Sequence, residues 1–273
     1  MPRPYLQLLA TSLALTILLS CKPSSQQDQA PISQKTATTA RIFPQVDTLP
    51  ANHLKFYIEF PQPMARGDIF KHFSLIETDS RKAVPEPFRE IELWDESTQR
   101  LTLWFHPGRQ KPGVNLNLEI GPILESGENY TLIISGKWQN EAGQLGENIT
   151  KNFRADPIDA QQPQPKRWKH SIPSAGSTQP FTITFLEPLD YALILRSIRL
   201  TAPGNPTVKI LHNDLSISFT PDTPWQTGTI TLHIDTKLED LAGNSIARPF
   251  NLDLQASPQD PVPTTLTRKF HIQ

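Results

Sequence analysis

The chain has 273 residues, with 26 basic and 27 acidic side chains and a formal net charge of −1. This length leaves room for two domains of ordinary size. Nucleic-acid-binding proteins typically have an excess of basic residues, and this chain has none. The single cysteine excludes an internal disulfide and a cysteine-based metal site.

Residues 1–20 have the organisation of a targeting segment. Arg3 supplies positive charge ahead of the apolar stretch 6–19, which is short for a membrane span. The sequence Leu-Leu-Ser-Cys that ends at Cys21 resembles the lipobox of bacterial lipoproteins. This resemblance implies a signal peptide that is removed before Cys21, lipidation of that cysteine and attachment to a membrane. The alternative is an ordinary secretory signal with an incidental cysteine.

Residues 21–41 are expected to form a lipidated, flexible tether. The run after Cys21 is polar and has too little apolar surface to build a core. Lys22 stands where an aspartate would be associated with inner-membrane retention. The lipoprotein resemblance therefore implies a location in the cell envelope, at the outer membrane of a Gram-negative bacterium.

A first domain is predicted over residues 42–156. Apolar side chains alternate with polar ones along residues 54–60, 101–105 and 130–134, as in strands that bury one face. Prolines, glycines and short polar side chains separate these runs at intervals of about ten residues. The pattern predicts an all-β fold of two packed antiparallel sheets.

The first domain also carries a long connection at residues 108–122. Long loops on rigid sandwiches are frequent recognition sites. The candidate binding residues in and beside this segment are Trp104, Arg109, Lys111, Asn115 and Asn117. The alternative is that Leu116, Leu118 and Ile120 cover a sheet edge or pack between the domains.

Residues 157–165 read as a short linker, and a second domain is predicted over residues 166–256. Its inward-facing positions are expected in the runs 181–185, 215–219 (including Leu215) and 230–234. The tail 257–273 ends in an alternating segment that is suited to one further strand.

The second domain repeats the first. Residues 130–143 align with residues 230–243 without a gap, and each copy runs from an alternating strand into a polar turn closed by Ala-Gly. The upstream strands match in the same order, and only the lengths of the connections between them change. A loop can gain residues at little cost in conformational entropy, whereas a strand cannot slip by one residue without turning its core face outward. The chain is therefore predicted to contain two copies of one sandwich.

Three segments of the second copy carry a family resemblance. These segments resemble the bacterial Ig-like domain of S-layer and cell-surface proteins (SbsA-type, Big_5). They are Phe185-Leu186-Glu187-Pro188-Leu189-Asp190, Phe219-Thr220-Pro221 and Leu238-Glu239-Asp240-Leu241-Ala242-Gly243-Asn244. The resemblance implies two tandem Ig-like β-sandwiches. The first copy departs from the last motif, so its membership depends mainly on the internal repeat.

The repeated turn suggests two interpretations. Glu239, Asp240 and Asn244 offer hard oxygen ligands that suit Ca²⁺, although the same residue types commonly cap a turn by bonding its backbone amides. Of the five tryptophans, Trp104 lies out of phase with its apolar neighbours and is the one most expected to be exposed, where it could stack on a sugar ring, although tryptophans of sandwiches more often lie in a core or an interface. No cofactor is expected.

Catalytic motifs of the usual kinds are absent from the sequence, and no enzyme is predicted. The sequence favours an envelope lipoprotein whose two Ig-like domains act as a structural or protein-interaction module. Its expected partners are a membrane, through the lipid anchor, and envelope proteins or glycans, not nucleic acid. A glycan- or calcium-binding surface module is the alternative. An enzyme with a site at the domain junction is the weaker one.

Overall fold

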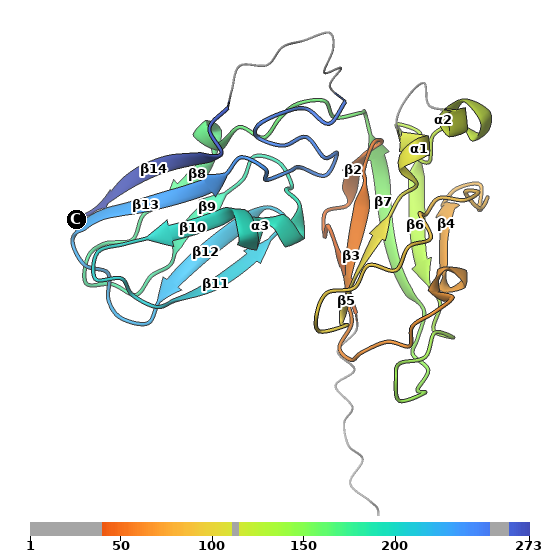
Figure 1. Ribbon diagram of the computed structural model, residues 1–273, viewed down its shortest axis with the longest axis horizontal. Coiled ribbons are helices and arrows are strands. Elements are labelled where there is room, and N and C mark those ends of the chain that lie inside the picture. Colours follow the sequence, from red (N-terminus) through yellow and green to blue (C-terminus); the bar gives the residue numbers. More distant parts are fainter. Residues whose placement is uncertain (1–39, 111–114, 252–261) are drawn as a thin grey trace, which may run out of the picture. The chain divides into compact units, whose positions relative to one another are not determined.

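Two sheets that share one apolar core make up the first half of the computed structural model, which describes residues 40–110, 115–251 and 262–273 (Figure 1). One sheet has the order β1-β3-β5, and the other has the order β2-β7-β6-β4. Their strands are β1 (Arg41–Phe43), β2 (Thr48–Pro50), β3 (Lys55–Glu59), β4 (Phe73–Glu77), β5 (Arg100–Trp104), β6 (Asn129–Ile134) and β7 (Ile149–Asp156). All pairs are antiparallel except β2–β7, which is parallel.

The register of these strands follows from the alternation of apolar residues. Ile58 lies opposite Leu101 in one sheet, and Leu75 lies opposite Leu132 in the other, and all four side chains are buried. The side chain of Phe56 joins the two layers through contacts that include the ring of Phe153, with the ring centroids 5.8 Å apart. A slip of one residue would move each of these side chains from the core to the solvent-facing side of its sheet, so their burial determines the register of the strands.

The second half of the chain repeats this arrangement. One sheet has the order β11-β12-β9-β8 and the other the order β10-β13-β14. The strands are β8 (Lys169–Ser171), β9 (Phe181–Thr184), β10 (Ile198–Thr201), β11 (Val208–Asn213), β12 (Ser216–Pro221), β13 (Gly228–Asp235) and β14 (Thr265–Ile272). A separate apolar core lies between these two sheets, and all of their pairs are antiparallel.

The two halves have the same pairing scheme. The pair β3–β5 corresponds to β9–β12, and the sheet β4-β6-β7 corresponds to β10-β13-β14. Phe60 and Phe105 are buried in the first copy, as Phe185 and Phe219 are in the second. The protein is therefore an all-β fold of two Ig-like sandwiches. The tail segment forms β14, which pairs with β13 along its whole length.

Local features differ from expectation at a few points. Leu215 was expected to face inward, but it lies in the turn between β11 and β12 and is 39% exposed. The described residues include three helices too short to give a sequence period: α1 (Pro107–Gln110), α2 (Asn115–Ile120) and α3 (Tyr191–Ser197). They also include 3₁₀ helices at Ile69–His72 and Pro165–Arg167.

The predicted signal peptide, Cys21 and the tether up to residue 39 lie outside the described residues. Within the described part of the chain, no helix has both the length and the apolar character needed to cross a bilayer.

Candidate functional site

The segment that connects the sandwiches is hydrogen-bonded to both of them. The side-chain amide of Asn52 donates to the carbonyl of Asp159 at 2.8 Å, and the Asp159 amide returns a bond to Asn52 Oδ1 at 3.0 Å. Gln162 Nε2 donates to the carbonyls of Ser245 and Ile246 at 3.1 and 3.0 Å. The connection is therefore held at one end by the side chain of Asn52 from the first copy, and at the other by its own Gln162 side chain, which bonds backbone carbonyls of the second copy.

A buried ion pair joins the first sandwich to the second. Lys55 Nζ on β3 lies 2.6 Å from Asp190 Oδ2, and the two side chains are 11% and 1% exposed. The Tyr57 hydroxyl donates to the same carboxylate, 2.9 Å from each oxygen. Asp190 also caps α3, because its Oδ1 accepts a bond from the Leu193 amide. Such a pair is retained only when every charge is compensated, as it is here.

The chemistry of Tyr57 follows from this environment. Burial and the neighbouring Asp190 carboxylate raise the pKa of the Tyr57 phenol far above its ordinary value. Tyr57 therefore stays a neutral hydrogen-bond donor at any pH at which the protein is folded. Its role at this position is to hold the carboxylate, and it supplies no proton for exchange.

Aromatic and apolar contacts surround the ion pair. The rings of Phe43 and Tyr191 stack with their centroids 3.7 Å apart, and Tyr191 also stacks on His212 at 4.5 Å. The Tyr191 hydroxyl donates to Glu59 Oε1 at 2.9 Å, and burial together with this carboxylate raises the pKa of Tyr191 to about 12. Leu241, from the second sandwich, packs into the core of the first. Residues 38–273 accordingly form one compact unit.

The predicted calcium turn is a hydrogen-bonded turn of the fold. Asp240 Oδ1 accepts from the amides of Ala242 and Asn244 at 2.8 and 2.9 Å, and Asp240 Oδ2 accepts from Asn244 Nδ2 at 2.9 Å. The Glu239 carboxylate is directed instead to Lys55, at 3.4 Å. The three predicted ligands Glu239, Asp240 and Asn244 therefore do not converge on one point, and turn capping explains Asp240 and Asn244.

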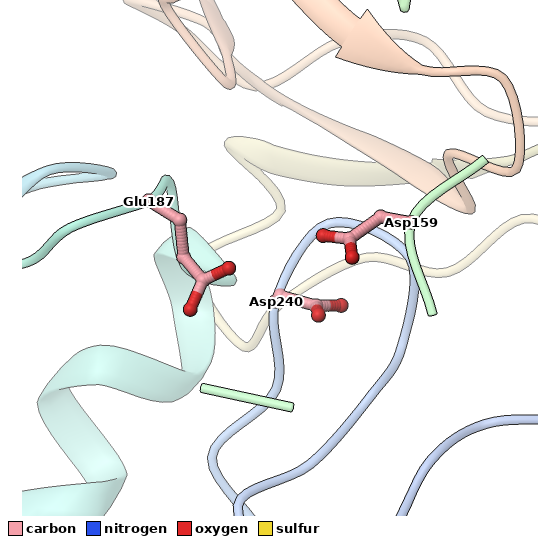
Figure 2. Close-up of side chains that lie close together, drawn as sticks. All are labelled: Asp159, Glu187 and Asp240. Atoms are coloured by element: carbon pink, nitrogen blue, oxygen red, sulfur yellow. The ribbon is translucent and has the colours of Figure 1, made fainter. Parts of the chain in front are cut away.

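A different set of carboxylates meets at Asp240. The carboxylate oxygens of Asp159, Glu187 and Asp240 lie within 4.8 Å of one another (Figure 2). Burial raises the pKa of Asp240 to about 7, and burial with the nearby Asp159 raises that of Glu187. Three carboxylates at this spacing repel one another when ionised, so a proton or a hard cation would relieve them.

These carboxylates line a groove of about 490 Å³ at the junction. Asp156 adds a fourth carboxylate, and the rest of the wall is mainly apolar, with Ile158 and Leu215 half exposed. The groove lining contains no His, Cys, Ser, Lys or Arg side chain among the described residues. Raised carboxylate pKa values are also seen at acid–base sites, and the described lining residues include no cationic side chain that could stabilise a developing anion. The groove can hold a positive group.

The residues predicted to bind a ligand in the 108–122 segment mostly hold that segment together. Arg109 is 2% exposed, and its guanidinium donates to the carbonyls of Pro85, Gly121 and Pro122. Asn117 Nδ2 donates to the Arg109 carbonyl at 2.6 Å. Arg109 is thus inaccessible to a ligand, because it satisfies loop carbonyls that would otherwise be buried without a donor.

Other predicted positions in this region differ in accessibility. Asn115 is the first residue of α2, and Lys111 lies outside the described residues. On α2, Leu118 and Ile120 are 71% and 38% exposed, so they do not cover a sheet edge or fill a domain contact. Trp104 is half buried, whereas Trp138, Trp168 and Trp225 are buried, and Lys55 Nζ lies 4.8 Å from the centroid of a Trp104 ring. A sugar would have to displace an ion-paired lysine to stack there.

The ion pair between the sandwiches could not be predicted from the sequence. Lys55 and Tyr57 are two residues apart in one run, and its alternation predicts only that both face away from the core. Asp190 is the last residue of one of the segments that resemble the bacterial Ig-like domain, and this was the only feature of the sequence that singled it out. Nothing in the one-dimensional pattern connects these positions.

The fold and junction define a tandem Ig-like β-sandwich protein. Residues 163–255 match the family described as the bacterial Ig-like domain, Big_5, which confirms the resemblance predicted for the second copy. A comparison with curated proteins gave no match. Among solved structures, the chain is similar to the crystal structure of the titin domains z1z2 in complex with telethonin. The identity is 9%, the coverage is 82% of this chain and 89% of that one, and the TM-score is 0.22. Values this low add nothing to the fold seen directly.

Proposed function

We propose that this chain is a lipid-anchored protein of the bacterial cell envelope, in which two joined Ig-like sandwiches act as a structural or protein-interaction module. The junction carries the proposal. A buried ion pair, a stacked aromatic pair and a leucine shared with the neighbouring core hold residues 38–273 as one compact unit. A stiff unit on a polar tether is better suited to display or bracing at a membrane surface than to catalysis.

The anchoring half of the proposal is tested in cells. The lipobox-like sequence before Cys21 supports transfer of acyl chains to that sulfur, which would fix the protein to a membrane without crossing it. Radiolabelled palmitate should enter the wild-type protein and not the Cys21→Ala variant, and that variant should leave the outer-membrane fraction. Equal labelling of both proteins would refute lipidation at Cys21. Cross-linking in intact cells would then identify the envelope proteins that contact the module.

Calcium binding is the second candidate function, and the carboxylates of Asp159, Glu187 and Asp240 favour it. Their oxygens are close enough to share one ion, and oxygen ligands are those that Ca²⁺ prefers. Adding Ca²⁺ to chelator-treated protein should raise the melting temperature of the wild type and leave Glu187→Gln unaffected. An unchanged melting temperature for the wild type would end this alternative.

A further inference from the structure

The outer face of the β10-β13-β14 sheet has an unusual composition. Buried residues such as Ile198, Ile230 and Phe270 alternate with side chains that point away from the core. We call these outward side chains the threonine face: Arg199, Thr201, Thr229, Thr231, His233, Asp235, Thr265, Thr267, Lys269 and His271. Half of them are threonines, and none is a large apolar residue.

Cross-strand pairing places the basic groups of this face next to hydroxyls. Arg199 lies opposite His233, and Thr231 lies opposite Lys269. Residues opposite each other across a sheet are about 5 Å apart at Cβ, so these groups form a continuous array. His233 Nε2 and the Thr201 hydroxyl are 3.3 Å apart.

The positive charges on this face have no acidic partner. Among the described residues, no ion pair includes Arg199 or Lys269, and both side chains are exposed. The one carboxylate of the face, Asp235, accepts a bond from the Lys237 amide at the strand end. The face therefore presents free cationic donors to solvent although the whole chain is close to neutral.

The first sandwich shows that these charges are not required by the fold. The sheet β4-β6-β7 pairs in the same way, and Ser74 lies opposite Ile133 where Arg199 lies opposite His233. By the same register, Asn152 takes the place of Lys269. At the positions of Arg199 and Lys269 the second sandwich thus carries basic residues where the first builds the same sheet with neutral ones. The place of His271 is basic in both copies, since Arg154 occupies it in the first. The charges of Arg199 and Lys269 are therefore the ones that point to recognition.

We infer that the threonine face is a binding surface for an anionic polysaccharide. The eight-residue strands β13 and β14 give it a length of about 27 Å, and with the four-residue β10 its width is about 10 Å, which suits a linear polymer. Arg199 and Lys269 would pair with carboxylates along the chain, and the threonine hydroxyls would donate to and accept from sugar hydroxyls. The face has no Phe, Tyr or Trp ring for stacking nucleic-acid bases and no large apolar side chain to enter a membrane.

The experiment uses the protein from Lys22 onward, so it does not depend on anchoring or on the proposed envelope location. Polygalacturonate in a native gel should retard the wild type, whereas neutral dextran should not, and added salt should weaken the retardation. The Arg199→Ser, Lys269→Asn variant carries the residues of the first sandwich and should bind roughly tenfold more weakly, as expected for two lost charge-assisted contacts.

A matched control removes the same charge elsewhere. Lys137 and Arg154 are exposed on the first sandwich, and the Lys137→Asn, Arg154→Ser variant should bind like the wild type. Circular dichroism and melting temperature should be unchanged in both variants, since all four side chains face solvent. Absence of retardation, equal weakening by the two variants, or preference for phosphatidylglycerol vesicles over polygalacturonate would overturn the inference.

Discussion

Replacement of Asp190 by alanine should weaken the whole unit, because it leaves a buried ammonium without its closest partner. The Asp190 carboxylate is 2.6 Å from Lys55 Nζ and also accepts the Tyr57 hydroxyl and the first-turn amide of α3. Breaking one side of a buried pair costs about 3–5 kcal/mol, and the lost helix cap is worth about 1 kcal/mol. Glu239, 3.4 Å from the same ammonium, offers partial compensation. We expect a loss of about 3 kcal/mol in unfolding free energy, near the lower end of that range.

Urea denaturation followed by tryptophan fluorescence measures this loss, because Trp104 lies directly beside Lys55. Asp190→Asn retains an oxygen for Tyr57 and for the cap, so it should lose less than Asp190→Ala. The double variant Lys55→Met, Asp190→Asn leaves no buried charge in the pair and should regain much of the stability. Asp68→Asn, which removes the exposed negative partner of Lys71 and keeps a residue type tolerated at the positive φ of this position, is the control and should have no measurable effect. A similar small effect for Asp190→Ala and Asp68→Asn would refute the reasoning.

Three further predictions use other parts of the unit. The pKa of Asp240 is raised from 3.8 to about 7 in the folded protein, so its favourable contribution is complete below the ordinary value and is lost as pH rises through about 7. In chelator, Asp240→Asn should therefore flatten the decline in melting temperature between acidic and neutral pH, and an unchanged slope would contradict this. Gly243→Ala should destabilise more than Gly143→Ala in thermal melts. Both glycines have positive φ, but only at Gly243 would the new Cβ meet Leu54 Cδ1, at 2.5 Å; equal losses would be inconsistent with that contact. Arg109→Met should cost about 3 kcal/mol in urea unfolding by leaving buried carbonyls without donors, whereas a loss near zero would show that water replaces the guanidinium.

The sandwich cores could be predicted from the sequence because burial in a sheet has a period of two. Phe56 and Ile58 are buried together, and the matched strand of the second copy buries Phe181 and Ile183 in the same way. The duplication added a second constraint, since a strand must keep its phase in both copies while a loop need not. Leu215 departs because the turn between β11 and β12 ends the alternation there.

The site was less predictable, since it depends on contacts between positions far apart in the chain. Arg109 was expected to meet a ligand because it is a charged residue in a long segment, yet three carbonyls from its own neighbourhood converge on it. Asp240 was expected to share a cation with Glu239, but its carboxylate neighbours are Asp159 and Glu187. Turn chemistry is local and was predicted, whereas the partners brought by folding were not.

The junction between the sandwiches was the part of the structure that was least predictable from the sequence. An alternating strand marks Lys55 only as facing away from its own core, which is also what a solvated lysine does. Its burial depends on α3, whose N-cap residue is Asp190, and a helix of seven residues is too short to give a detectable period.

Nuclear magnetic relaxation of backbone amides tests most directly whether the two sandwiches move as one body. Amides in β3 and β6 and amides in β9 and β13 should report a single rotational correlation time in the wild type, and two shorter times in Asp190→Ala. Two distinct correlation times in the wild-type protein would contradict a joined unit.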